Sequence, residues 1–231
     1  MNPRGVLTAF VYLFAMRSLL ANAPDHLVPP YEDRDWGVSD YAALLENKLF
    51  LTPATYGRVL VRPSAGSIGE SSLSLHPSSH EGTVSVTYVR ASRNVWYYLS
   101  YPPSPASRHS AHEAWEDAPL RFSRSDATLP ASAGAALRAA LAAMLRGTRG
   151  RYPGTTRVIV DGYDIQFSLV ESGKTMRGVI TAGLTGKNVS ELEKVVDLLE
   201  SFCQAPSARQ ASLATQIERK AKQIVARTNK T

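Results

Sequence analysis

The sequence predicts an α+β fold in which two or three helices pack on a mainly antiparallel sheet. Short segments of alternating apolar and polar residues follow one another between turn residues over positions 55–100, and a second group of such segments follows over positions 157–182. Amphipathic helical patterns separate and follow the two groups. Strands in consecutive runs are typical of antiparallel α+β domains and not of parallel, doubly wound sheets.

The first half of the chain predicts one short helix and a meander of strands. Ser39 is suited to capping a helix that carries Tyr41, Leu44, Leu45 and Leu49. The alternating segments that follow predict strands at 56–61, 71–75, 83–89, 94–99 and 120–125. The segment 94–99 is included because it is rich in β-branched and aromatic residues.

The second half predicts a helix, a hairpin and a third strand. Leucine and methionine residues at helical spacing predict a helix over 132–146, ended by Gly147. Asp161-Gly162 lies between apolar segments at 157–160 and 163–169, which predicts a hairpin with a type I′ turn. Ser172-Gly173 predicts a further turn into a strand over 175–182.

Two helices are expected to close the chain. Ser190 and Glu193 have the spacing of a capping box, and an apolar stripe follows that ends beside Cys203. Cys203 is the chain's one cysteine, and we expect it to be a buried thiol. The last segment, 207–228, predicts an amphipathic, basic helix for which loose packing in solvent is the first expectation.

Three regions are expected along the chain. Residues 1–23 have the pattern of an export signal, with Arg4, an apolar run over 6–16 and Ala21-Asn22-Ala23 at the expected cleavage site. Cleavage after Ala21 and an uncleaved anchor are the alternatives. The run is shorter than the roughly 20 residues that span a bilayer. Residues 24–204 then form a single α+β domain and 205–231 a basic tail. We therefore expect a bacterial periplasmic or extracellular protein.

The charge distribution argues against nucleic-acid binding. The chain has a net charge of +6, but residues 24–204 hold 18 basic and 19 acidic side chains, so the excess lies at the two ends. Nucleic-acid domains carry their basic patch on the folded surface. The basic terminal helix remains compatible with weak contact with a membrane surface, since its apolar stripe is thin.

Part of the sequence resembles a group of exported proteobacterial proteins for which no activity is established. The similarity runs over 84–204 and consists of Trp96-Tyr97, the segment 141–145, Asp161-Gly162 with Phe167-Ser168, and a helix that ends near Cys203. The resemblance implies export and a bacterial source, and it implies no chemistry.

Histidines in two loops are the candidate metal ligands. His76 and His80 form one pair, and His109 and His112, with Glu113, form the better one. Such groups ligate zinc, although neither pair has the helical HExxH arrangement. The simpler interpretation, solvent-exposed histidines in serine-rich loops, is favoured, so we expect no cofactor, with zinc as the alternative.

Aromatic residues are the candidate binding residues. Trp96, Tyr98 and Tyr101 lie on the strand expected at 94–101, and Trp115 lies in the proline-rich loop 101–118. Tryptophan and tyrosine are enriched where proteins bind one another.

No catalytic motif is found, so a non-enzymatic binding protein is the first functional hypothesis. Its partner would be another exported protein, as for inhibitors and immunity proteins. The first alternative is a metal-dependent or carboxylate hydrolase that uses the histidine loops. The second is a structural protein of the cell envelope, held by the basic tail.

Overall fold

A computed structural model of the chain describes most of the region after the expected export signal. Described are residues 25–29, 40–50, 55–63, 68–80, 82–100, 119–150, 163–181 and 185–230. The expected export signal, the hairpin turn at Asp161-Gly162 with the segment 157–160, and the loop 101–118 lie outside these ranges.

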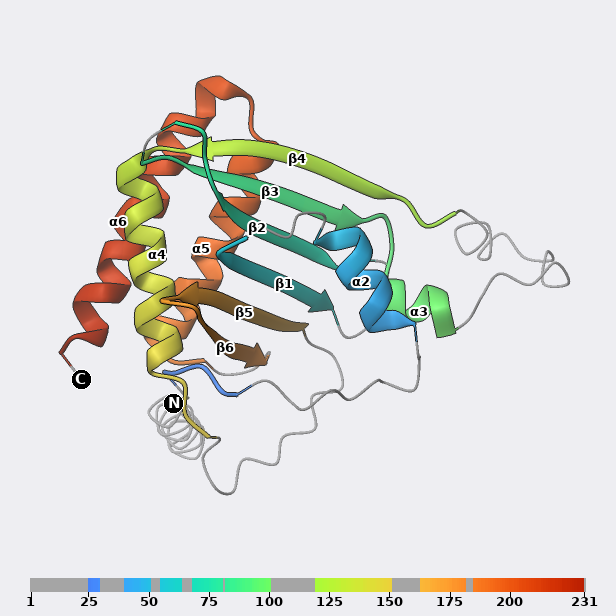
Figure 1. The fold of residues 1–231 in the computed structure, drawn as a ribbon, viewed down its shortest axis with the longest axis horizontal. Helices are drawn as coiled ribbons and strands as arrows, with labels where there is room; N and C mark the ends of the chain where they lie inside the picture. Colours follow the sequence, from blue (N-terminus) through green and yellow to red (C-terminus); the bar gives the residue numbers. More distant parts are fainter. Residues whose placement is uncertain are drawn as a thin grey trace, which may run out of the picture.

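The α+β prediction is confirmed: a six-stranded antiparallel sheet is packed by helices (Figure 1). The strands lie in the order β4-β3-β2-β1-β5-β6. The first half of the chain forms a meander of β1 (Gly57–Pro63), β2 (Ser71–Pro77), β3 (Val84–Ala91) and β4 (Phe122–Leu129). The second half adds the hairpin of β5 (Tyr163–Glu171) and β6 (Lys174–Thr181), which joins the sheet beside β1.

Three helices build the main core on one face of the sheet. They are α4 (Ala131–Arg146), α5 (Lys187–Gln204) and α6 (Ser207–Thr228). Alternate residues of a strand point to the same side of the sheet. On this side they are apolar, and Leu73 lies beside Val59 and Val86 beside Leu75. The stripe predicted for 192–202 is buried in this core, and the predicted burial of Cys203 is confirmed.

The opposite face of the sheet carries a smaller core under α2 (Tyr41–Leu49) and α3 (Val95–Ser100). Tyr41, Leu45 and Leu49 project from α2 onto Leu60 and Val89 of the sheet. Figure 1 shows both short helices near the ends of β1 and β3, away from α4 and α6.

The strand predicted over 94–99 is wrong. Residues 95–100 form α3, and the chain leaves β3 at Ala91. The aromatic and β-branched composition favours a strand, but in the described part of the chain no strand pairs with this segment. A buried carboxylate instead holds the amides at the start of the segment in a helical turn.

The capping box predicted at Ser190 is also wrong. Helix α5 begins at Lys187, and its N-cap is Gly186. The Asp25 carboxylate caps it instead, because it accepts hydrogen bonds from the backbone amides of Asn188 and Val189. A local sequence signal could not reveal a cap that comes from the other end of the chain.

The hairpin turn at Ser172-Gly173 is confirmed. Both residues have positive φ, 51° and 76°, the backbone geometry of a type I′ turn, and Glu171 pairs with Lys174 across it.

The terminal helix is packed against the domain, in contrast to the loose, solvated helix expected. α6 lies against α4 and α5, and its residues Ala214, Ile217, Ala221 and Ile224 are buried in the main core. Small residues on the packed side allow the helices to approach closely. The basic residues are left mainly on the outer side.

Candidate protein-binding surface

The start of α3 is fixed by one buried side chain, Glu70, which precedes β2. Its carboxylate accepts hydrogen bonds from the backbone amides of Val95 (2.6 Å) and Trp96 (3.2 Å) and from the Tyr41 hydroxyl (2.9 Å). Glu70 has 0% exposure. A carboxylate at the first amides of a helix satisfies donors that the helix itself leaves unpaired. Glu70 thus joins α2, α3 and the sheet at one point.

Asn94 makes a second attachment of α3. Its side-chain oxygen accepts from the Tyr97 amide at 2.8 Å, which is the N-cap hydrogen bond. Its side-chain nitrogen donates to the carbonyl of Pro63, at the end of β1. The Asn94 side chain is buried, so this link between α3 and the sheet is shielded from water.

The segment before β2 lies close against the chain that enters α3. A Cβ added at Gly69 would lie 2.2 Å from the carbonyl oxygen of Ala91, so only glycine fits there. The neighbouring residue, Ile68, is 57% exposed. An apolar side chain is thus presented to solvent next to the contact that anchors α3.

Helix α3 presents aromatic side chains on a rigidly anchored turn. Tyr97 is 39% exposed, while Trp96 and Tyr98 are half-buried. The guanidinium of Arg93 lies 5.5 Å from the centre of the Tyr98 ring, within the range of a cation–π contact. We call the side chains of Trp96, Tyr97 and Tyr98, which are consecutive residues of α3, the α3 surface.

The structure places two of the four predicted aromatic residues. Trp96 and Tyr98 lie on α3, and Tyr101 and Trp115 are outside the described residues. On a strand, Trp96 and Tyr98 would share one face, but residues two apart on a helix point in different directions. Between them, Tyr97 is the most exposed of the three aromatic residues on α3.

The histidine loops are described only in part. His76 is half-buried at the end of β2 and His80 is exposed in the following turn, whereas His109, His112 and Glu113 lie outside the described residues. Within the described ranges, no three His, Cys, Asp or Glu side chains are grouped as metal ligands. The zinc alternative therefore stays a prediction.

A carboxylate row on α5 was not predicted. Glu193, Asp197 and Glu200 follow helical spacing, and burial raises the pKa of each carboxyl group above its ordinary value. Ser71 donates to Glu200 at 2.9 Å and Tyr163 donates to Glu193 at 3.1 Å. The spacing at i, i+4 and i+7 could have indicated the row. It could not have shown that Glu193 and Glu200 accept hydrogen bonds from residues of the sheet.

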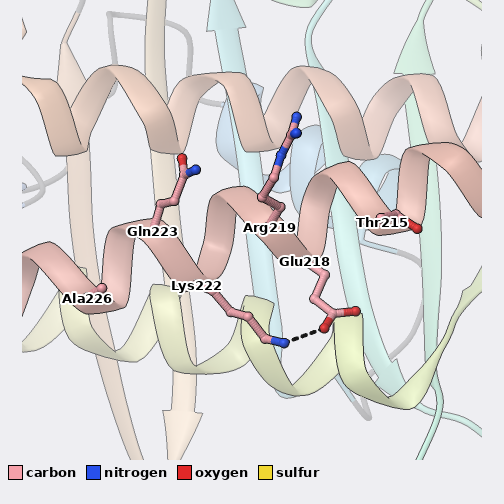
Figure 2. A pocket seen from close by; sticks show the side chains of 6 residues that line it. All are labelled: Thr215, Glu218, Arg219, Lys222, Gln223 and Ala226. Atoms are coloured by element: carbon pink, nitrogen blue, oxygen red, sulfur yellow. Dashed lines mark hydrogen bonds and ion pairs between the residues drawn. The ribbon is translucent and has the colours of Figure 1, made fainter.

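The outer face of α6 forms a shallow, open depression (Figure 2). Figure 2 shows Arg219 and Gln223 directed to one side of the helix and Glu218 and Lys222 to the other. Lys222 pairs with Glu218 at 2.5 Å, and Ser132 of α4 donates to Glu218 at 2.7 Å. The lining residues are Thr215, Glu218, Arg219, Lys222, Gln223 and Ala226.

This arrangement bears on the expected membrane contact of the tail. The isoleucines Ile217 and Ile224 are buried against α4 and α5, so α6 offers mainly polar side chains outward. Among the described residues, no helix is long and apolar enough to cross a membrane.

No family model, curated protein or solved structure matches the chain. Its function has to be inferred from the α3 surface and the chemistry of its side chains.

Proposed function

We propose that this chain is an exported, non-enzymatic binding protein, of the inhibitor or immunity kind, that holds another protein through the α3 surface. The observation that carries the proposal is the anchored aromatic helix: Trp96, Tyr97 and Tyr98 stand on one turn whose first amides are bound by the buried Glu70. Export is supported by the signal pattern over residues 1–23.

Rigid aromatic side chains suit protein recognition for two reasons. Tyrosine and tryptophan have few rotatable bonds, so they bury a large area at a small cost in conformational entropy. A preorganised helix lowers that cost further, because its backbone is ordered before the partner arrives. The two hydrogen bonds of Asn94 supply this order together with Glu70.

The test is affinity capture from the envelope and culture fluid of producing cells, with the retained proteins quantified by mass spectrometry. Tyr97→Ala should reduce the captured partner about tenfold or more, the loss typical of an interface hot spot. Trp96→Ala should also reduce capture, and it removes packing against the smaller core as well. Tyr163→Ala is the matched control, since Tyr163 is 40% exposed and lies on β5.

Equal retention by the Tyr97→Ala variant and the Tyr163→Ala control would contradict the proposal. Far-UV circular dichroism of each variant confirms that the fold is kept, so that a loss of capture reports on the surface. Tyr97 is partly exposed and lies outside both buried cores, and the substitution should leave the fold intact.

A further inference from the structure

The two edges of the sheet differ in what covers them. On β6, the backbone of Val28 exchanges hydrogen bonds with Val179 at 3.1 and 2.8 Å, so the N-terminal segment covers part of that edge. On β4, no strand among the described ranges pairs with the outer side. Figure 1 shows β4 as a long outermost strand. An edge strand is a template for another strand.

The backbone groups that point outward from β4 follow from its pairing with β3. Ser92 donates its amide hydrogen to the carbonyl of Arg121 at 2.8 Å, which continues the register of the two strands. Hydrogen-bonded and non-bonded pairs alternate in an antiparallel ladder, so every second residue after Arg121 also faces β3. The residues between them turn their N–H and C=O groups to the open edge, and these are Phe122, Arg124, Asp126 and Thr128.

The hydrogen bonds of β3 with the chain at the start of β2 support the outward direction of Phe122. Ala91, which lies opposite Phe122, donates its amide hydrogen to Glu70 on the β2 side at 2.8 Å. Ala91 therefore directs its amide away from β4, as expected if Phe122 faces outward.

The outward residues carry two opposite charges at fixed positions. Arg124 makes two hydrogen bonds to the Asp126 carboxylate, at 2.9 and 3.0 Å, and Thr87 donates to the same carboxylate at 2.6 Å. Both charged side chains are about half exposed, 46% for Arg124 and 50% for Asp126. They lie on the same face of the sheet because they are two residues apart.

We propose that β4 pairs antiparallel with β4 of a second copy of this chain, about a two-fold axis at Ser125. In this register Arg124 lies opposite Asp126 of the partner subunit, and Phe122 lies opposite Thr128 of the partner subunit. Each of these pairs is repeated by the symmetry, and the two sheets become one continuous sheet. The contact is isologous, as in most symmetric dimers.

Charge and hydrogen bonding select the same register. Shifting the partner strand by two residues in one direction would place Arg124 opposite Arg124 of the partner subunit. Shifting it by two residues in the other direction would place Asp126 opposite Asp126 of the partner subunit. Like charges directly opposite each other destabilise a strand pair, and opposite charges stabilise it. The central register also uses all four outward residues, and Pro130, which has no amide hydrogen, ends the pairing beyond Thr128.

The test is the mass of the protein in solution, in the processed form that producing cells make, by light scattering after size exclusion and by native mass spectrometry. The wild-type chain is expected to dimerise. Arg124→Asp and Asp126→Arg should each weaken dimerisation on the order of tenfold or more, since every central pair becomes like-charged. An equimolar mixture of these two variants should form heterodimers, because the opposed charges are again complementary.

Thr128→Pro provides a second probe that does not depend on charge. It removes one outward amide hydrogen and leaves the bonds to β3 in place, so it should weaken the dimer while far-UV circular dichroism stays unchanged. If either charge variant fails to fold, Thr128→Pro decides. A monomeric wild-type chain would overturn the proposal, as would a dimer that none of these changes weakens or a mixture that yields no heterodimer.

Discussion

The Glu70 carboxylate lies 2.6 Å from the backbone nitrogen of Val95, and this buried contact decides the conformation of the aromatic segment after it. Three donors surround the Glu70 carboxylate: the amides of Val95 and Trp96 and the hydroxyl of Tyr41. Glu70 itself has no exposure to water. A helix of six residues is too short to be stable alone, so α3 depends on such tertiary contacts.

Glu70→Gln should loosen α3 and lower the free energy of unfolding by about 1–3 kcal/mol. Both carboxylate oxygens of Glu70 accept from backbone amides, and glutamine has an NH2 group, which cannot accept, in place of one of them. Hydrogen exchange of the Val95 and Trp96 amides should become faster. Tyr41→Phe is the control: it removes the hydroxyl donor and keeps both helix amides bonded, so those amides should stay protected. Unchanged exchange in the Glu70→Gln variant would show that the carboxylate does not hold the helix.

Asp25→Ala should destabilise the protein by about 1 kcal/mol, the usual effect of losing an N-cap. The Asp25 carboxylate binds amides of Asn188 and Val189 at the start of α5. Urea denaturation measures the change. Asp25→Asn is the comparison, since the side-chain oxygen of asparagine can still accept hydrogen bonds from the helix amides and should keep most of the stability. Equal effects of the two substitutions would argue against a capping role for the Asp25 side chain.

Glu191 ties α6 to α5 and predicts a pH dependence. Its carboxylate accepts from Lys220 of α6 at 2.6 Å and from Lys194 at 3.0 Å, and these partners lower its pKa from 4.5 to about 2. Because the pKa is lower in the folded state, the ion pairs stabilise the fold above pH of about 4.5, and the contribution is lost as the pH falls toward 2.

Glu191→Gln should therefore destabilise the protein at pH of about 7 and have progressively less effect as the pH falls through that range. The measured quantity is the difference in urea midpoint between variant and wild type at each pH. Using this difference cancels the titration of the other carboxylates on α5. A difference that stays constant between neutral pH and pH of about 2 would contradict the role given to these ion pairs.

Cys203 should not react with thiol reagents in the native protein. The side chain is buried in the main core, and burial raises the pKa of the thiol to about 12. Since the thiolate is the reactive form, labelling should need unfolding. The measurement is the labelling rate with and without urea, and rapid labelling of the native protein would show that α5 opens readily.

The strands and long helices were predictable because periodicity is a local signal. The alternation around Val84 and Val86, and the stripe through Leu192 and Leu199, reflect which face of each element is buried. The terminal helix was also predictable at 207–228. Its docking was not, because the alanines that pack it, such as Ala214 and Ala221, look neutral in a sequence.

The features missed were those fixed by residues far apart in the chain. Composition favoured a strand at 94–99, but Glu70, 25 residues before Val95, sets a helix there. Ser190 and Glu193 looked like a capping box, but Asp25, 163 residues before Asn188, is the cap. Both contacts depend on the folded arrangement, and no window along the sequence contains them.

The α3 surface is tested most directly by photo-crosslinking in producing cells, with a photoreactive phenylalanine analogue in place of Tyr97 and, as the control, in place of Tyr163. The two tyrosines are almost equally exposed, at 39% and 40%, and the analogue keeps an aromatic ring at each position. At position 163 the exchange also removes the hydrogen bond to Glu193. A binding role for the α3 surface predicts one dominant crosslinked protein from position 97 and none from position 163. No crosslink from position 97, or the same products from both positions, would contradict that role.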